Sequence, residues 1–315
     1  MKTKKVSVVM LNWNTPEMTI ECINSVLQSD YKNIEVNVVD NGSVDNSYEI
    51  LTDRYRNLVN VYRIDKNIGY AMGMNYGLKK ARNQNPDYFL IINNDTIIDK
   101  NAITQLVKTA LKHENLCVVT GKVFHFDDRN RLQTVGNRFD RKKIISKKIG
   151  WNELDTGQYD NEEIRDMVDD VFLLLPIQAY LLTNGYSNYF YMNYEQTDMI
   201  LRLIDLGFKP VYTPNAKLWH KGSYSTGGIG NPYMMYWEGK SNIIIHKMHQ
   251  NNFDFMVFYI TNLVMVLWSL MKGCIGSFIG KTKNLKSRYA RFRGVLSGTI
   301  WIFNRENETG YNPFY

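Results

Sequence analysis

Short apolar runs alternate with more polar segments through the first 123 residues of the chain. The runs are short and rich in Val, Ile and Leu, so we predict buried strands at residues 6–11, 34–39, 59–64, 88–92 and 116–123. We predict helices between them, at residues 16–29, 45–55 and 101–113, with a fourth that opens in the glycine-bearing loop 67–73 and ends at residue 81. This alternation is typical of an α/β fold, in which crossover helices flank a mostly parallel sheet.

The pattern changes after residue 123. Residues 127–165 are dense in charge and weak in apolar periodicity, so we expect a long surface excursion there. Further elements are predicted beyond it: an apolar strand at 171–175, an aromatic segment at 186–194, a helix at 195–206 capped by Gly207, and strand pieces at 211–214 and 217–220.

The C-terminal part of the chain is first apolar and then basic. Residues 256–271 carry no charge, which falls short of the about 20 apolar residues that a membrane-spanning helix usually needs. Seven basic residues follow: Lys272, Lys281, Lys283, Lys286, Arg288, Arg291 and Arg293. An apolar helix beside such a cluster is typical of peripheral binding to an anionic membrane surface. A buried helical hairpin with a solvated basic face is the alternative. We therefore expect a main domain over residues 1–250 and a helical extension over 251–315.

Composition narrows the class of partner. A net charge of +7 and a pI near 9.0 are compatible with nucleic acid, an anionic membrane or a phosphorylated substrate. No basic stripe with interleaved aromatic residues crosses the predicted sheet, so a nucleic-acid partner is disfavoured. Cys22, Cys117 and Cys274 are far apart and lack metal-ligand spacing, so we expect buried or free thiols in a reducing compartment. The apolar run at 6–11 is too short for the core of a signal peptide.

The strand at 88–92 ends abruptly in the polar stretch Asn93-Asn94-Asp95. In an open α/β sheet the carboxyl ends of the strands form the ligand crevice. A carboxylate flanked by amides at such an end can hold a hard divalent cation against a diphosphate. From these residues alone, a polar turn that merely stops the strand explains the stretch equally well.

Other polar motifs accompany this one in a fixed order: Asn12-Trp13-Asn14, Asp40-Asn41-Gly42-Ser43, Asn67-Ile68-Gly69, Tyr194-Glu195-Gln196-Thr197-Asp198 and His220. Their order and spacing resemble those of the family-2 inverting glycosyltransferases, and most of all the branch of bacterial rhamnosyltransferases that builds surface polysaccharide. The resemblance covers residues 6 to about 245. It implies an A-type glycosyltransferase fold, a Rossmann-like sheet with flanking helices, in which residues 1–250 bind a nucleotide sugar and 251–315 associate with a membrane.

The resemblance assigns a nucleotide site and a metal site. It implies that the Asp40 carboxylate accepts a hydrogen bond from the imide of a uracil or thymine ring, although an ordinary turn also explains this residue. The other implied nucleotide-binding residues are Asn12, Asn14, Asn67, Gly69, Asn93 and Asn94. Asp95 and His220 are the implied ligands of Mg²⁺ or Mn²⁺, which would stabilise the departing diphosphate. Asn93 replaces an acid of the family's metal motif and removes one charge from the site.

The resemblance also implies a catalytic base. An inverting transfer needs a carboxylate to take the proton of the acceptor hydroxyl. Many relatives carry an acid at the position of Gln196, and an amide cannot act as a base. We therefore expect Glu195 to be the base, with Asp198 as the second candidate, while both can instead be helix N-terminal acids favoured by the macrodipole. Where relatives commonly have Ser-Gly-Ala, this chain has Asp169-Asp170-Val171, a departure on the acceptor side.

The expected function is inverting transfer of a sugar from a UDP- or dTDP-activated donor, with dTDP-rhamnose as one candidate. The expected acceptor is a hydroxyl of a growing lipid-linked glycan at the cytoplasmic face of a bacterial plasma membrane, and a homodimer is compatible with this role. Because of Asn93 and Gln196, a non-catalytic nucleotide-sugar-binding scaffold of a polysaccharide assembly complex is the alternative. A sugar-nucleotide pyrophosphorylase is disfavoured, since no glycine-rich basic loop follows the first strand.

Overall fold

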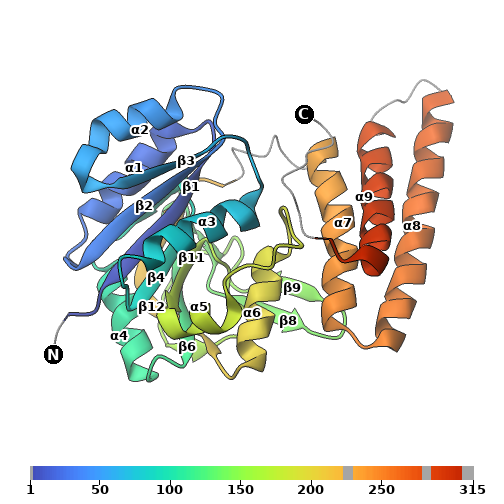
Figure 1. Cartoon of the computed structure of the whole chain (residues 1–315). Helices are drawn as coiled ribbons and strands as arrows, with labels where there is room; N and C mark the ends of the chain where they lie inside the picture. Colours follow the sequence, from blue (N-terminus) through green and yellow to red (C-terminus); the bar gives the residue numbers. More distant parts are fainter. Residues whose placement is uncertain (1–2, 223–229, 279–284, 307–315) are drawn as a thin grey trace.

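The computed structural model describes residues 3–222, 230–278 and 285–306. Its centre is a twisted sheet whose first half is parallel, as the alternating pattern predicted (Figure 1). Strand β1 (Val6–Asn12) lies between β2 (Ile34–Asn41) and β4 (Tyr88–Ile92), and β3 (Asn60–Ile64) pairs with the far side of β2. Parallel pairing puts the carboxyl ends of these strands at one edge, which is where their polar motifs begin.

The second half of the sheet is mixed. Strand β11 (Phe172–Pro176) runs antiparallel between β4 and β6 (Cys117–His125), and β12 (Lys209–His220) runs parallel to β6. The two predicted strand pieces at 211–220 are one strand, interrupted by a register shift between Tyr212 and Lys217. The short strand β5 (Thr96–Ile98) pairs with the end of β12, so that Thr96 lies opposite His220.

Helices cover both faces of the sheet because successive strand residues point to opposite sides. One core lies beneath α1 (Pro16–Leu27), α2 (Ser47–Tyr55) and α4 (Ala102–Lys112), and it includes Val8 and Met10 of β1. The other lies beneath α3 (Tyr70–Arg82), α5 (Ile177–Thr183) and α6 (Glu195–Asp205), and it includes Val9. The expected α/β class with flanking helices is confirmed, and Cys22 and Cys117 are buried free thiols, as predicted.

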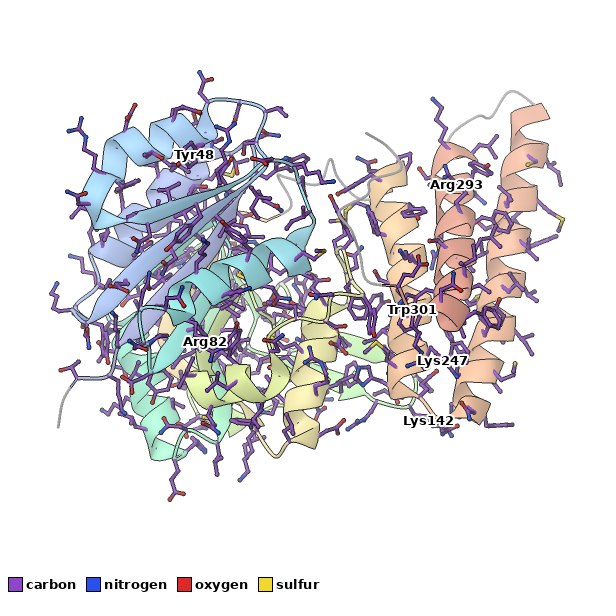
Figure 2. All side chains as sticks on the ribbon, in the orientation of Figure 1. Tyr48, Arg82, Lys142, Lys247, Arg293 and Trp301 are labelled. Atoms are coloured by element: carbon purple, nitrogen blue, oxygen red, sulfur yellow. The ribbon has the colours of Figure 1, made fainter. Side chains whose placement is uncertain are left out.

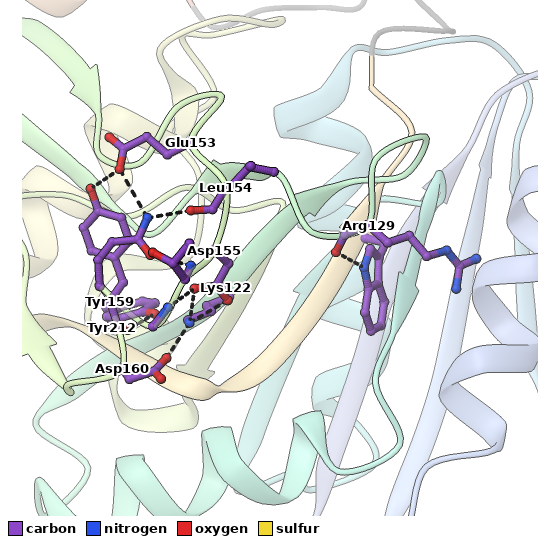
Figure 3. A network of polar contacts seen from close by, with 12 residues as sticks. Lys122, Arg129, Glu153, Leu154, Asp155, Tyr159, Asp160 and Tyr212 are labelled. Atoms are coloured by element: carbon purple, nitrogen blue, oxygen red, sulfur yellow. Dashed lines mark hydrogen bonds and ion pairs between the residues drawn. The ribbon is translucent and has the colours of Figure 1, made fainter.

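The predicted excursion at 127–165 carries regular structure that the sequence did not suggest, because two of its strands join the main sheet and a hairpin forms a separate two-stranded sheet. It contains β7 (Leu132–Thr134), which pairs with β6, the hairpin of β8 (Asn137–Asp140) and β9 (Ile145–Lys148), and β10 (Glu163–Ile164), which pairs with β12. The buried Lys122 ammonium binds Asp155 at 2.8 Å and Asp160 at 2.6 Å (Figure 3). Two acidic side chains that the sequence pattern would place in solvent therefore attach this segment to β6.

Three C-terminal helices pack together beside the sheet (Figure 1): α7 (Pro232–His249), α8 (Asn252–Phe278) and α9 (Leu285–Asn304). A Cβ added to Gly294 would lie 2.0 Å from the carbonyl oxygen of Tyr236, so α7 and α9 approach at backbone distance. Trp301 of α9, labelled in Figure 2, packs edge-on against Tyr189 with ring centroids 5.0 Å apart. The predicted boundary at residue 250 falls between α7 and α8, and α7 also contributes Ile244 to the core of the main domain.

Helix α8 is longer than the charge-free run suggested, because it continues through the polar residues at each end of that run. Among the described residues, the window Asn252–Gly276 alone has the length and composition of a membrane-spanning helix, with mean hydropathy 1.7 and 17% of it buried. Its exposed large apolar side chains are Phe253, Met256, Val257, Ile260, Val264, Met265, Leu267, Trp268, Met271 and Ile275. Two of the basic residues, Lys281 and Lys283, lie outside the described part of the chain, and Arg288 and Arg291 bind Ser269 and Glu238 within the bundle.

Candidate active site

Asp95 and His220 meet at the carboxyl edge of the sheet. Asp95 follows β4 and His220 ends β12, and the pairing of β5 with β12 brings the two together. His220 Nε2 lies 3.1 Å from Asp95 Oδ1, and the Lys221 amide donates to the Asp95 carbonyl oxygen at 2.9 Å. The structure therefore brings together the two residues predicted to bind a metal.

Gln133 contacts the other nitrogen of the His220 ring. Its Oε1 lies 2.6 Å from His220 Nδ1, and a carbonyl oxygen only accepts hydrogen bonds, so Nδ1 carries a proton. In the neutral imidazole, the lone pair of Nε2 then faces the Asp95 carboxylate. Two acceptors at this distance require a cation between them or a second proton on the ring. A partner on the far nitrogen is typical of metal-ligating histidines.

The donor set fits a hard divalent cation that takes most of its ligands from a bound molecule and water. Within the described part of the chain, no group of three or more His, Cys, Asp or Glu residues is placed to hold a metal ion. Asp95 and His220 would therefore supply two ligands, and the oxygen atoms of a diphosphate are suited to the remaining positions. The two candidate metal ligands thus come from both halves of the sheet.

A cavity of about 390 Å³ opens beside this pair. Of the predicted site residues it is lined by Asn67, Gly69, Asn93, Asn94, Asp95, Glu195 and His220. It is also lined by Tyr191 of the aromatic segment, and by Trp13, Thr15, Tyr70, Asp170 and Met234, which the sequence did not single out as site residues. Its volume is within the range of small-molecule and cofactor sites in proteins.

The glycine-bearing loop is fixed to the aromatic segment. The Asn67 side-chain oxygen accepts from the Gly69 amide at 2.9 Å and from the Tyr191 hydroxyl at 3.0 Å. Gly69 has φ +87°, and a Cβ there would lie 2.5 Å from the Tyr191 carbonyl oxygen. Only glycine fits both the backbone conformation and the contact. The loop therefore has a fixed shape where it lines the cavity.

Asn94 joins the end of β4 to the start of α1. Its side-chain nitrogen donates to Thr15 Oγ1 at 2.9 Å and to Thr19 Oγ1 at 2.8 Å. Asn94 therefore holds the turn that presents Asp95. Its role in nucleotide binding, like that of Asn93, stays a prediction.

Asp40, Asn12 and Asn14 lie outside the lining of the cavity. Asp40 is fully buried, and its carboxylate accepts from Asn12 Nδ2 at 2.8 Å and from the Ser43 hydroxyl at 2.5 Å. Asn14 has φ 55° and accepts from the Val44 amide at 2.9 Å. In this conformation these side chains stabilise the loops after β1 and β2. A hydrogen bond from Asp40 to a base would require Ser43 or Asn12 to release the carboxylate.

Glu195 begins α6 and lines the same cavity as Asp95 and His220. Burial raises the pKa of its carboxyl to about 8, and the charge of Asp170 contributes in the same direction. Its Oε2 has no hydrogen-bond partner among the described residues. Once it is ionised, above this raised pKa, a buried carboxyl with an unused oxygen can receive a proton from a bound molecule, as a general base must.

Asp198, the second candidate for the base, lies in the core and does not line the cavity, which corrects that prediction. Its carboxylate is fully buried and binds Arg202 Nε at 2.8 Å and His249 Nε2 at 2.8 Å. Spacing of three residues along a helix places its side chain one turn from Glu195, on the face that packs against α7. The residue joins α6 to α7.

A second cavity, of about 440 Å³, adjoins the first at Glu195. The two cavities share Asn193, Glu195, Gln196 and Met234, and the second adds Tyr194, Thr197 and Glu238. Its lining is rich in carboxyl, amide and hydroxyl groups. Glu195 therefore faces two adjoining spaces, one with the candidate metal ligands and one beside α7.

Sequence reasoning missed Gln133 and the role of Asp170. Gln133 lies in the charged segment whose apolar periodicity is weak, so no pattern marked it. Asp170 was noted only as a departure from the family, yet it lines the cavity and accepts from the hydroxyls of Tyr70 at 3.0 Å and Tyr186 at 2.7 Å. An acid immediately before a buried apolar strand was the available signal.

Residues 7–166, about half of the chain, match the family described as Glycosyl transferase family 2. Glycosyltransferase GlyG of Streptococcus pneumoniae serotype 4 is 32% identical over 126 residues, 39% of this chain and 40% of that protein. Poly-beta-1,6-N-acetyl-D-glucosamine synthase of Staphylococcus epidermidis is 23% identical over 296 residues, 89% of this chain and 66% of that protein. The chain thus spans less than two thirds of the length of either relative.

Two solved structures have the same fold. GalNAc-T7 with UDP, GalNAc and Mn²⁺ superposes with a TM-score of 0.60 at 12% identity, over 81% of this chain and 56% of that chain. S. aureus TarS 1–349 in complex with UDP-GlcNAc superposes with a TM-score of 0.52 at 16% identity, over 76% of this chain and 66% of that chain. The expected A-type glycosyltransferase fold is thereby confirmed, and at these identities the likeness extends to the fold alone.

Proposed function

The chain belongs to glycosyl transferase family 2. On that basis we propose that it transfers a sugar from a nucleoside-diphosphate sugar to a hydroxyl acceptor with inversion at the anomeric carbon. One observation carries the proposal. The Asp95–His220 pair and the buried Glu195 line the same cavity, although they come from separate parts of the chain. A site for a diphosphate-bound cation and a candidate base are the two parts that a direct displacement requires.

The donor in this proposal is a UDP- or dTDP-linked sugar. UDP and Mn²⁺ are bound in one structure of the same fold and UDP-GlcNAc in the other. The synthase of Staphylococcus epidermidis is named for poly-N-acetylglucosamine. These names support UDP-N-acetylhexosamines as first candidates, and dTDP-rhamnose stays a candidate from the sequence motifs.

The protein's own residues have defined tasks in this reaction. Mg²⁺ or Mn²⁺, when bound, would neutralise charge that builds on the departing diphosphate. Asp95 and His220 would hold that ion. Gln133 contacts Nδ1 of the His220 ring, so that Nε2 would face the ion. Glu195 would take the proton of the acceptor hydroxyl on the side opposite the diphosphate. No second nucleophile is needed, because the acceptor oxygen attacks the sugar directly.

The acceptor in this proposal occupies the second cavity. Glu195 borders both cavities, so in this proposal a hydroxyl in the second would approach a sugar in the first beside that residue. The second cavity lies against α7. Helix α8 packs in the same bundle as α7 and carries the exposed apolar residues. This arrangement supports a lipid-linked acceptor and contact with the cytoplasmic face of the bacterial plasma membrane through the C-terminal helices. A homodimer remains compatible with it.

Turnover of donors distinguishes this function from its alternative. Purified protein is incubated with UDP- and dTDP-sugars, Mn²⁺ and glycan acceptors, beside Asp95→Ala and Glu195→Ala, and released nucleotide is measured. We expect release from the wild-type protein and a loss of at least about 100-fold in each variant. Equal release by all three proteins would contradict the proposal.

A non-catalytic scaffold is the second candidate, and one observation favours it. Burial of Glu195 raises its pKa to about 8, so this carboxyl is largely protonated at neutral pH and cannot accept a proton there. Calorimetry that detects nucleotide binding without turnover from pH 6 to 9, over a panel of acceptors, would favour the scaffold. Turnover that rises towards alkaline pH would favour the enzyme.

A further inference from the structure

Asp170 is a buried carboxylate that the tasks assigned above do not use. It lies two residues before β11, lines the first cavity and is only 5% exposed. Its Oδ2 accepts from the Tyr186 hydroxyl at 2.7 Å and from the Tyr70 hydroxyl at 3.0 Å. The two tyrosine rings pack edge to face with centroids 5.8 Å apart, so the hydroxyls are held in place. A carboxylate with two fixed donors on one oxygen has a defined orientation.

The neighbouring acid Asp169 points elsewhere. It accepts from Asn137 Nδ2 at 2.8 Å and from Gln196 Nε2 at 3.2 Å, and it does not line either cavity. Gln196 in turn accepts from the Asp170 amide at 3.3 Å. The amide at position 196 thus ties the two acids in place, and of these two acids only Asp170 faces the cavity.

Asp170 and Glu195 influence each other's charge. Burial raises the pKa of Asp170 to about 6, against the two tyrosine hydrogen bonds that favour its ionised form, and Asp169 adds to the increase. Burial raises the pKa of Glu195 to about 8, and Asp170 is the charged group that adds to this increase. Burial and the charges of Asp170 and Glu195 keep the pKa of Tyr70 and of Tyr186 well above the ordinary value, so both stay neutral donors.

We propose that Asp170 is a positioning residue for the sugar transfer, and this inference rests on the proposed function. Tyr70 and Tyr186 hold the Asp170 carboxylate, and this carboxylate makes Glu195 a stronger base towards the acceptor hydroxyl. Negative charge on Asp170 disfavours a second negative charge on Glu195. Once ionised, Glu195 therefore binds a proton more tightly, and proton transfer from a weakly acidic sugar hydroxyl becomes easier.

The step balances as follows. The acceptor O–H bond breaks and its proton moves to the Glu195 carboxylate, while the acceptor oxygen forms a bond to the anomeric carbon. The bond between that carbon and the diphosphate oxygen breaks, and its electron pair leaves with the nucleotide. Asp170 stays ionised throughout, and Glu195 then returns its proton to water. No oxidant or further reactant is required.

The pH dependence of kcat/KM tests this role. It is measured for the wild-type protein and for Asp170→Asn, Tyr186→Phe, Glu195→Gln and the matched control Asp169→Asn. We expect the acid limb of Asp170→Asn to move to lower pH by about one unit, because Glu195 then ionises without a charged neighbour. Tyr186→Phe, which removes one donor that favours ionised Asp170, should move the limb in the same direction by less. Asp169→Asn should keep the wild-type profile, and Glu195→Gln should lose about 10²- to 10⁴-fold in rate.

Two results would overturn the proposal. An acid limb that stays at its wild-type position in both Asp170→Asn and Tyr186→Phe would show that Asp170 does not act on Glu195. Loss of activity in Asp170→Asn as complete as in Glu195→Gln, with nucleotide binding intact, would make Asp170 the base itself.

A measurement without substrate separates this proposal from the proposed function. Unfolding is followed at pH 5.5 and pH 8.5 for Asp170→Asn, Glu195→Gln and the double variant. The two substitutions should be coupled at pH 8.5, where both carboxyls ionise, and much less at pH 5.5. Coupling in a protein that shows no sugar transfer would refute the proposed function but support the interaction between Asp170 and Glu195. Additive effects at both pH values would refute that interaction, whatever the activity.

Discussion

His220 Nε2 lies 3.1 Å from Asp95 Oδ1, so the last residue of β12 contacts the turn after β4. The contact depends on β5, which pairs antiparallel with the end of β12 and places Thr96 opposite His220. Gln133 of β7 completes the arrangement from the segment expected to be a surface excursion. The candidate metal site thus joins both halves of the sheet.

Gln133 should control metal affinity although it does not face the ion. Gln133→Ala removes the acceptor that fixes the Nδ1 proton of His220, so the ring can rotate or change tautomer. We expect Mn²⁺ to bind about 10- to 100-fold more weakly in the presence of UDP, as measured by calorimetry. Gln158→Ala, a change of an exposed glutamine in the same segment, is the control and should bind Mn²⁺ as the wild type does. Equal affinities in both variants would contradict the role of Gln133.

Gly69 should be intolerant of a side chain. Gly69→Ala introduces a Cβ 2.5 Å from the Tyr191 carbonyl oxygen at a residue with φ +87°. Gly207→Ala is the matched control, because Gly207 has φ +90° and no atom within 4 Å of the added Cβ. Both variants bear the conformational cost of about 1 kcal/mol. Only Gly69→Ala should lose further stability and nucleotide affinity, by chemical denaturation and calorimetry. Equal losses in both would contradict the tight contact.

Glu195 should make the fold less stable as pH rises. Its pKa is about 8 in the folded chain, against an ordinary value of 4.5, so the folded state binds the proton more tightly. The contribution of the protonated Glu195 carboxyl to the free energy of unfolding is fully present below pH 4.5 and is lost as pH rises through about 8. Relative to wild type, Glu195→Gln should therefore gain stability between pH 5 and pH 8, by roughly 3 kcal/mol. A difference independent of pH in urea denaturation would contradict the raised pKa.

Lys122 should hold the charged segment on the sheet. Its buried ammonium pairs with Asp155 and Asp160, and Asp155 is itself mostly buried (Figure 3). Lys122→Ala leaves the Asp155 carboxylate without its partner, so we expect a loss of about 3 kcal/mol in unfolding free energy. Lys217→Ala, on the neighbouring strand and exposed, is the control and should change stability by less than about 0.5 kcal/mol. Similar losses in the two variants would contradict this assignment.

The exposed face of α8 should bind membranes. Ile260→Lys with Val264→Lys places two charges on that face, and we expect binding to anionic vesicles in a flotation assay to fall at least about tenfold. Val44→Lys with Leu58→Lys makes the same change on two exposed residues of the main domain. Vesicle binding that survives the α8 change, or falls equally in the control, would contradict a membrane contact through this helix.

Much of the fold could be predicted from local pattern. Runs such as 88–92 are buried on both faces of a parallel sheet, so their composition marks them as strands. The Asp95–His220 site was expected from the resemblance of the ordered motifs to those of the glycosyltransferase family, and the position of Asp95 at the carboxyl end of a strand agreed with it. The structure of residues 127–165 could not be predicted, since Lys122, Asp155 and Asp160 neutralise one another only in the folded chain. Asp198 was misjudged for a similar reason, because its partner His249 lies in a distant helix.

The most direct test of the central claim is nucleotide release from UDP- and dTDP-sugars with Mn²⁺ and glycan acceptor at pH 8, for wild type, His220→Ala and Glu195→Gln. The account predicts release by wild type, loss of Mn²⁺-dependent nucleotide binding in His220→Ala, and intact nucleotide binding in Glu195→Gln with release reduced at least about 100-fold. Release at the wild-type rate by Glu195→Gln, or Mn²⁺-dependent binding unchanged in His220→Ala, would contradict it.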